Sequence, residues 1–144
     1  MAAEIAEARP EELAIVLALL SEASLPRDGV AEHFPDFLVA REAGEIAGAV
    51  GMERYGDSVL LRSLVVAPSR RGEGLGRALA EHLLEAARRR GARRVFLLTE
   101  TAPDFFARLG FRPIARDAAD AAVQVSPEFR TCCPQSAVCM RRDI

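Results

Sequence analysis

The sequence contains no apolar run long enough to cross a membrane and no excess of basic residues. Its 19 basic residues are interleaved with 21 acidic residues, which gives a net charge of −2. A membrane span needs about 20 consecutive apolar residues, so the hydropathy pattern argues against a membrane protein. The absence of a basic surplus argues against nucleic acid as a main partner.

Cysteine is scarce, and its count of three is odd. An odd number does not suit a disulfide framework, whereas it does suit the reducing cytosol. The first residues, Met-Ala-Ala-Glu, lack the basic and apolar segments of a signal peptide. We therefore expect a cytoplasmic protein. Cys132, Cys133 and Cys139 do not have the paired spacing of a zinc site, so we expect no metal, with arsenite or metal binding as the open alternative.

What is present is an ordinary globular composition in a chain of 144 residues, with 50% hydrophobic and 28% charged residues. This length corresponds to one domain with a real core, so we expect a single domain over residues 1–144. No internal repeat or linker interrupts the sequence.

The apolar pattern alternates between strand and helix periods. Apolar stretches bounded by turn residues predict strands, and apolar residues three or four apart predict helices. A strand, a helix and a further strand in one sheet imply a right-handed crossover with parallel pairing. We predict an α/β (α+β) fold with a mixed, mostly antiparallel sheet flanked by helices. The strands are expected at 4–8, 37–40, 46–52, 59–66 and 93–98, and the main helices after Pro10, Gly74 and Pro103.

The chain is organised around residues 64–79, where an apolar strand ends at Pro68 and a helix begins after Gly74. Glycines at 72, 74 and 76 let the backbone approach a ligand closely and adopt positive φ. The unpaired N–H groups and the dipole of a helix N-terminus favour an anion there. We interpret this turn as a phosphate cradle, and a glycine-rich turn without a ligand is the alternative.

Two segments resemble signatures of the GNAT N-acetyltransferases over residues 37–112. Arg71-x-x-Gly74-x-Gly76 resembles the (Gln/Arg)-x-x-Gly-x-(Gly/Ala) loop, which in that family binds the pyrophosphate of coenzyme A. Ala-x-x-Phe-Phe-x-x-Leu-Gly-Phe, at 102–111, resembles the segment that flanks the thiol end of the coenzyme. The resemblance implies a GNAT fold, acetyl-CoA as co-substrate, and coenzyme binding by Leu64, Val65, Val66, Arg71, Gly72, Glu73, Gly74, Leu75, Gly76, Arg77 and Phe106.

Residues 61–66, 97–102 and 133–140 resemble the acetyltransferases of bacterial arsenic-resistance operons. The segment 98–106 is also similar to the acetyltransferase domain of N-acetylglutamate synthases. Both resemblances imply an N-acetyltransferase whose acceptor is a small amino-acid-like amine, with a role in arsenic resistance or detoxification. A non-catalytic acyl-CoA-binding sensor of the same fold is the alternative.

The implied chemistry needs a base for the amine and a donor for the thioester oxygen. The resemblance implies that a backbone N–H near Val66 is the donor. Glu53 is the candidate base, and an exposed glutamate at a strand end is the alternative. Phe106 occupies a position where many GNAT enzymes place a tyrosine acid, so either Tyr55 substitutes from elsewhere or the thiolate leaves without an acid.

Arg62 lies in an otherwise apolar strand, where an unpaired charge is costly. It either pairs with an internal acid such as Glu53 or presents its guanidinium to a substrate carboxylate. Strict alternation would place Arg62, Leu64 and Val66 on one face of the strand. His33 is a second candidate for the acceptor site, with a plain surface histidine as the alternative.

We also expect a homodimer. The expectation rests on the family resemblance and on the apolar segment 137–140, which could cover a sheet edge against a partner.

Overall fold

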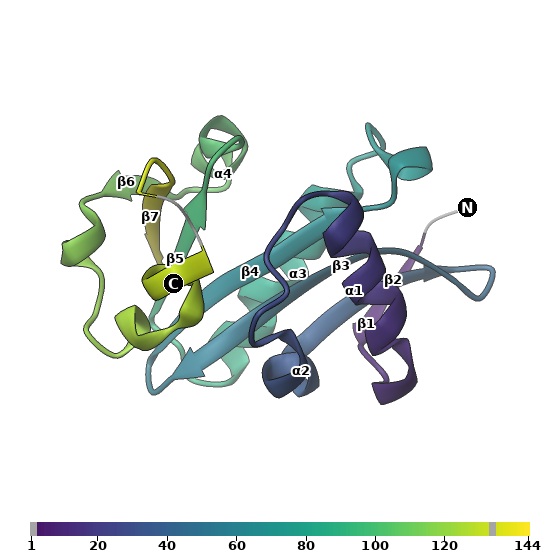
Figure 1. Cartoon of the computed structure of the whole chain (residues 1–144), viewed down its shortest axis with the longest axis horizontal. Coiled ribbons are helices and arrows are strands. Elements are labelled where there is room, and N and C mark those ends of the chain that lie inside the picture. The colour runs from purple at the N-terminus through teal and green to yellow at the C-terminus, as the bar shows by residue number, and fades with distance from the viewer. Residues whose placement is uncertain (1–2, 133–134) are drawn as a thin grey trace.

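The computed structural model describes residues 3–132 and 135–144, which form one seven-stranded sheet in the order β1-β2-β3-β4-β5-β7-β6 (Figure 1). All neighbours pair antiparallel except β4 and β5, which are joined by the crossover helix α3 and pair in parallel. The predicted mixed, mostly antiparallel α/β fold is confirmed. The strands are β1 Glu4–Glu7, β2 Phe37–Glu42, β3 Glu45–Tyr55, β4 Ser58–Val66, β5 Arg94–Thr99, β6 Arg112–Ile114 and β7 Val138–Asp143.

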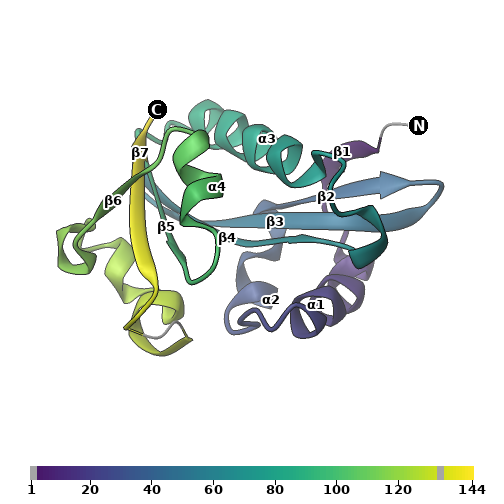
Figure 2. The same cartoon turned by 90° about the horizontal axis from the view of Figure 1, so that it is seen from above.

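Helices cover both faces of this sheet (Figure 2). On one face lie α3 (Leu75–Arg89) and α4 (Pro103–Arg108), and on the other lie α1 (Leu13–Glu22) and α2 (Val30–His33). Within the described ranges, no helix has both the length and the apolar character needed to cross a bilayer. Short 3₁₀ turns occur at Pro10–Glu12, Phe34–Asp36, Pro68–Arg70, Arg116–Ala118 and Val123–Val125, and a π-helical turn, η6, at Glu128–Cys132.

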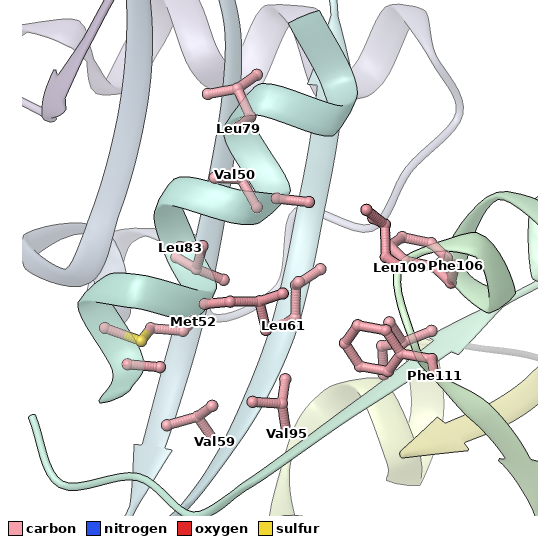
Figure 3. Close-up of a cluster of buried hydrophobic side chains, with 14 of the residues drawn as sticks. Val50, Met52, Val59, Leu61, Leu79, Leu83, Val95, Phe106, Leu109 and Phe111 are labelled. Carbon is pink, nitrogen blue, oxygen red and sulfur yellow. The ribbon is translucent and has the colours of Figure 1, made fainter. Parts of the chain in front are cut away.

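The main core lies between α3, α4 and the sheet. Leu79 and Leu83 of α3 point onto Val50 and Leu61, while Phe106 of α4 closes the same cluster from the side (Figure 3). The opposite face has its own core, in which α1 and α2 bury Val16, Leu20, Val30, Phe34, Phe37, Val39, Ala49 and Val65.

Gly51 allows this second core to close. A Cβ built at position 51 would lie 2.1 Å from the Phe37 ring, which is far inside van der Waals contact. The ring of Phe37, which is fully buried, therefore occupies space that any side chain at position 51 would need.

A β-bulge interrupts β4. Ala49 pairs with Val65 and Gly51 pairs with Arg62, so Ser63 and Leu64 together face the single residue between them on β3. Ser63 adopts φ +61°, a conformation that is uncommon for a residue other than glycine. The bulge reverses the alternation of side chains. Leu64 and Val66 pack on the α3 face, whereas Arg62 contacts Glu53 and the loop before α2. The prediction that Arg62, Leu64 and Val66 share one face is therefore wrong.

The C-terminal strand does not cover an edge. β7 is paired with β5 on one side and with β6 on the other, and Cys139 and Met140 are buried within the chain. Residues 138–140 therefore belong to an internal strand of the sheet. The prediction that the segment 137–140 covers a sheet edge against a partner subunit is wrong. The dimer itself stays a prediction that rests on the resemblance.

Candidate active site

A cavity of about 450 Å³ opens where β4 and β5 separate. The two parallel strands pair only from Ser58–Leu60 against Arg94–Phe96, although β4 continues to Val66 and β5 to Thr99. The diverging strands form the walls of the cavity. Its remaining lining comes from the loop after α1, the loop before α4, α4 itself, Arg71, Glu128 and Ala137.

The predicted phosphate cradle lies at the entrance of α3. Gly74 is the residue before the helix and has φ +82°, and Gly72 has φ +85°. No atom lies within 4 Å of a Cβ built at either glycine, so these positions need glycine for backbone conformation rather than for space. The segment 71–74 is exposed, and the first N–H groups of the 15-residue helix have no partners inside it. This backbone can hold an anion.

Arg71 connects the cradle to the cavity. Its Nε donates to the carbonyl oxygen of Val66 at 3.3 Å, which fixes the loop against the end of β4. The guanidinium of Arg70 is already paired within the protein, since it donates hydrogen bonds to Glu42 and Glu73. Arg77 is exposed beside Glu81, one helical turn further on. The positive charge at the cavity mouth therefore comes from Arg71.

The end of β4 offers backbone groups to the cavity. Ala67 N–H donates to Ala47 O on β3. Successive N–H groups of an extended strand point to opposite sides, so the N–H of Val66 points away from β3, toward the diverging side. Leu64, Val65 and Val66 all line the cavity. This geometry suits the predicted donor to a thioester oxygen.

Phe106 lines the same cavity from α4, with 7% of its surface exposed. The centroid of its ring lies 5.0 Å from that of Phe105 and 5.8 Å from that of Phe111. A phenyl ring has no proton to donate to a leaving thiolate. Tyr55 does not line the cavity, and its hydroxyl donates to Glu53 Oε1 at 2.5 Å. Burial, and then the hydrogen bond to Glu53, raise the pKa of Tyr55 well above its ordinary value. The structure therefore offers no support for Tyr55 as a substitute acid.

Glu53 and Arg62 form a buried ion pair between β3 and β4. Arg62 Nη1 donates to Glu53 Oε2 at 2.7 Å, and both side chains are fully buried. Burial pushes the pKa of Glu53 up, but hydrogen bonds from Tyr55, Ser126 and Arg62 outweigh it and hold that pKa below its ordinary value. Glu53 is thus not an exposed strand-end residue, and it is not among the residues that line the cavity.

Arg62 lines the cavity in addition to pairing with Glu53. Its Nε donates to Ser63 Oγ at 3.0 Å and its Nη2 to Pro26 O at 3.4 Å, so the bonds to Glu53, Ser63 and Pro26 hold the guanidinium in place. His33 lies behind this pair on α2, with Nε2 3.8 Å from Glu53 Oε1, and does not line the cavity. The structure brings Arg62 to the cavity with Leu64, Val65, Val66, Arg71 and Phe106, but not Glu53 or His33.

The sequence analysis missed Glu128. Its side chain lines the cavity, is 9% exposed, and places Oε1 3.7 Å from Arg62 Nε. In the sequence it follows Ser126-Pro127, which looks like the start of a short helix with an acid in its first turn. Its proximity to Arg62 depends on how the C-terminal segment crosses the sheet, and no local pattern signals that.

Of the cysteines, Cys139 is buried, and burial raises the pKa of its thiol to about 11. Cys133 and the side chain of Cys132 lie outside the described residues. In the described part of the chain, no three metal-ligating side chains are grouped as a metal site would require.

The sequence profile of the acetyltransferase (GNAT) domain matches residues 33–113. An uncharacterized N-acetyltransferase of Chlorobaculum tepidum is 32% identical over 91 residues, which are 62% of this chain and 58% of that protein. An amino-acid acetyltransferase of Mycobacterium tuberculosis is 39% identical over 87 residues, or 59% of this chain and 45% of that protein. The chain therefore spans about half the length of these relatives.

Solved structures share the fold of this chain over almost its full length. N-acetylglutamate synthase from Neisseria gonorrhoeae, complexed with coenzyme A and N-acetyl-glutamate, superposes with a TM-score of 0.84 at 21% identity, over 98% of this chain and 35% of that one. A Mycobacterium tuberculosis protein in complex with CoA superposes with a TM-score of 0.81 at 23% identity, over 98% and 99% of the two chains. At these identities the likeness establishes the fold.

Proposed function

Since the chain belongs to the GNAT acetyltransferase family, we propose that it transfers the acetyl group of acetyl-CoA to the amino group of a small, amino-acid-like acceptor. One observation carries the proposal: Arg71, the residue directly before the glycine cradle of α3, lines the cavity between the diverging strands and bonds to the end of β4. A long co-substrate with an anionic end and a reactive thioester end fits such a path.

Different parts of the chain bind different parts of acetyl-CoA. The backbone N–H groups of residues 72–77 bind the pyrophosphate, and Arg71 adds positive charge beside them. Leu64, Val65 and Val66 offer the edge of β4 that β5 leaves unpaired, while Phe106 and Phe105 pack against the thiol end. The N–H of Val66 donates to the thioester oxygen, where negative charge grows as the amine attacks.

The acceptor end is the part of the cavity beside Arg62, opposite the cradle. An arginine fixed by three internal bonds keeps further N–H donors for a carboxylate. The relatives named amino-acid acetyltransferase support an acceptor of this class. A role in arsenic resistance, acting on an amino acid that carries an arsenical group, belongs to the same proposal.

The test is acetyl-CoA turnover on a panel of amines. The panel contains the twenty proteinogenic L-amino acids, their methyl esters, tyramine, spermidine and an arsenical amino acid, with thiol release as the readout. We expect turnover on at least one free amino acid and little on its methyl ester, because the ester removes the carboxylate that Arg62 would bind. Acetyl-CoA binding by calorimetry without thiol release on any amine would favour a non-catalytic sensor instead.

A further inference from the structure

The cavity has one polar, buried end. Arg62 and Glu128 face it from β4 and from the start of η6, with side chains 0% and 9% exposed, and Ser63, whose Oγ accepts a hydrogen bond from Arg62, also lines the cavity. The other cavity-lining carboxylate among the described residues belongs to Glu100, which is exposed at the mouth. A buried carboxylate at the acceptor end therefore comes from Glu128 alone within the part of the chain described.

Glu53 is poorly suited to act on the acceptor. Its two oxygens already accept hydrogen bonds from Tyr55 and Arg62, its side chain is fully buried, and it does not line the cavity. A carboxylate engaged in this way holds Arg62 in position.

Glu128 differs from Glu53 in position, because it lines the cavity while also lying close to Arg62. One guanidinium faces two carboxylates, because Arg62 Nη1 bonds to Glu53 while Arg62 Nε lies 3.7 Å from Glu128 Oε1 and donates to Ser63 instead. A buried carboxylate that lines the cavity favours a cationic ligand, and an acceptor amine arrives as an ammonium ion.

The backbone holds Glu128 in place. Its N–H donates to the Oγ of Ser126, which is fully buried and also bonds to Glu53. Ser126 therefore ties the first turn of η6 to the ion pair beneath it. A residue whose backbone is anchored in this way is suited to orienting a substrate group.

We propose that Glu128 binds the ammonium group of the acceptor and takes one of its protons. The inference rests on the proposed function and adds the group that prepares the nucleophile. The ammonium gives one proton to the Glu128 carboxylate, and the freed lone pair forms the C–N bond as the C–S bond breaks. The second proton leaving the nitrogen goes to the departing thiolate, and Glu128 later releases its own proton to solvent.

The decisive variant is Glu128→Gln, which keeps the size of the side chain and removes its charge. Removing a general base costs roughly 10²–10⁴-fold in rate, so kcat/KM on the best acceptor of the panel should fall at least a hundredfold at pH 7. Glu128→Asp should recover part of that loss. Acetyl-CoA affinity should stay within twofold of wild type, and Glu32→Gln, on the exposed face of α2, should match the wild-type protein throughout.

The pH profile separates proton transfer from mere structural support. Without Glu128 the amine must arrive already neutral, so kcat/KM of Glu128→Gln should rise about tenfold per pH unit between pH 7 and 8.5. The wild-type value should change less than threefold over the same range. Other charged or titratable groups near Glu128 are shared by both proteins and cannot produce the difference: Glu53, Tyr55, Arg62, His33, Arg71, Glu100 and Arg116.

A second measurement needs no variant. In the presence of saturating CoA, the best acceptor should bind the wild-type protein at least ten times more tightly than its analogue with a hydroxyl in place of the amino group. Equal affinities would overturn the ammonium contact, and a folded Glu128→Gln with wild-type kcat/KM at each pH would overturn the proton transfer. If the wild-type protein acetylates no amine of the panel, the proposed function fails first, and that result is distinct from both.

Discussion

At the scale of single residues, Arg62 both pairs with a buried acid and lines the cavity. The sequence analysis offered either an internal acid or a substrate carboxylate as its partner, and the structure satisfies the first while leaving Arg62 at the cavity. A guanidinium has five N–H donors, so pairing with Glu53, Ser63 and Pro26 does not exhaust it. The internal bonds orient the remaining donors.

Arg62→Lys tests that orientation. Lysine keeps a positive charge near Glu53 but loses the planar fork that binds a carboxylate through two bonds. We expect the acceptor KM to rise about tenfold, equivalent to about 1.4 kcal/mol, with acetyl-CoA affinity unchanged. Arg54→Lys is the matched control, because Arg54 pairs with Asp36 at the surface. An unchanged acceptor KM in a folded Arg62→Lys protein would reduce Arg62 to a structural partner of Glu53.

At the scale of elements, the cradle and α3 were predictable because their signals are local. Glycines, a proline and helical spacing all lie within residues 64–79, so the start of α3 after Gly74 could be inferred and is confirmed. The β-bulge was not predictable, because Ser63 adopts positive φ without a glycine or asparagine to mark it. The position of Glu128 depends on contacts between segments more than 60 residues apart, which no local pattern contains.

Gly74→Val tests the cradle as an element. A β-branched residue is strained at φ +82°, so the loop should shift and take the N–H groups of α3 away from the pyrophosphate. We expect the acetyl-CoA Kd to rise at least tenfold. Gly56→Val is the control, since Gly56 has φ +68° and equally open surroundings in the β3–β4 turn. If both variants fold and bind acetyl-CoA equally well, the cradle does not hold the coenzyme.

At the scale of the whole molecule, buried ion pairs join segments that are distant in sequence. Glu12, at the entrance of α1, accepts two bonds of 2.7 Å from Arg41 of β2, and Glu53 joins β3 to β4 through Arg62. The bonds from Arg41 outweigh burial and hold the pKa of Glu12 below its ordinary value. The pKa of Glu53 is also lowered, despite burial.

These lowered pKa values predict how stability depends on pH. A carboxyl group whose pKa is lower in the folded than in the unfolded chain stabilises the fold above the unfolded pKa, and this contribution is lost as the pH falls through the folded value. Both glutamates have an ordinary pKa of 4.5. The free energy of unfolding, measured with urea, should therefore change little between pH 7 and about 5.5 and fall steadily below about 4.5.

Glu12→Gln isolates one of these pairs in the intact protein. Glutamine fills the same space but cannot compensate the charge of Arg41, whose side chain is only 12% exposed. Charge-assisted hydrogen bonds contribute about 1.5–3 kcal/mol each before non-additivity, so a loss of about 1–3 kcal/mol at pH 7 is expected. Because the lost contribution is the one that acid removes, the variant and the wild-type protein should converge in stability as the pH approaches 3. A difference that stays constant down to pH 3 would mean that packing around Glu12, rather than its charge, stabilises the junction of α1 and β2.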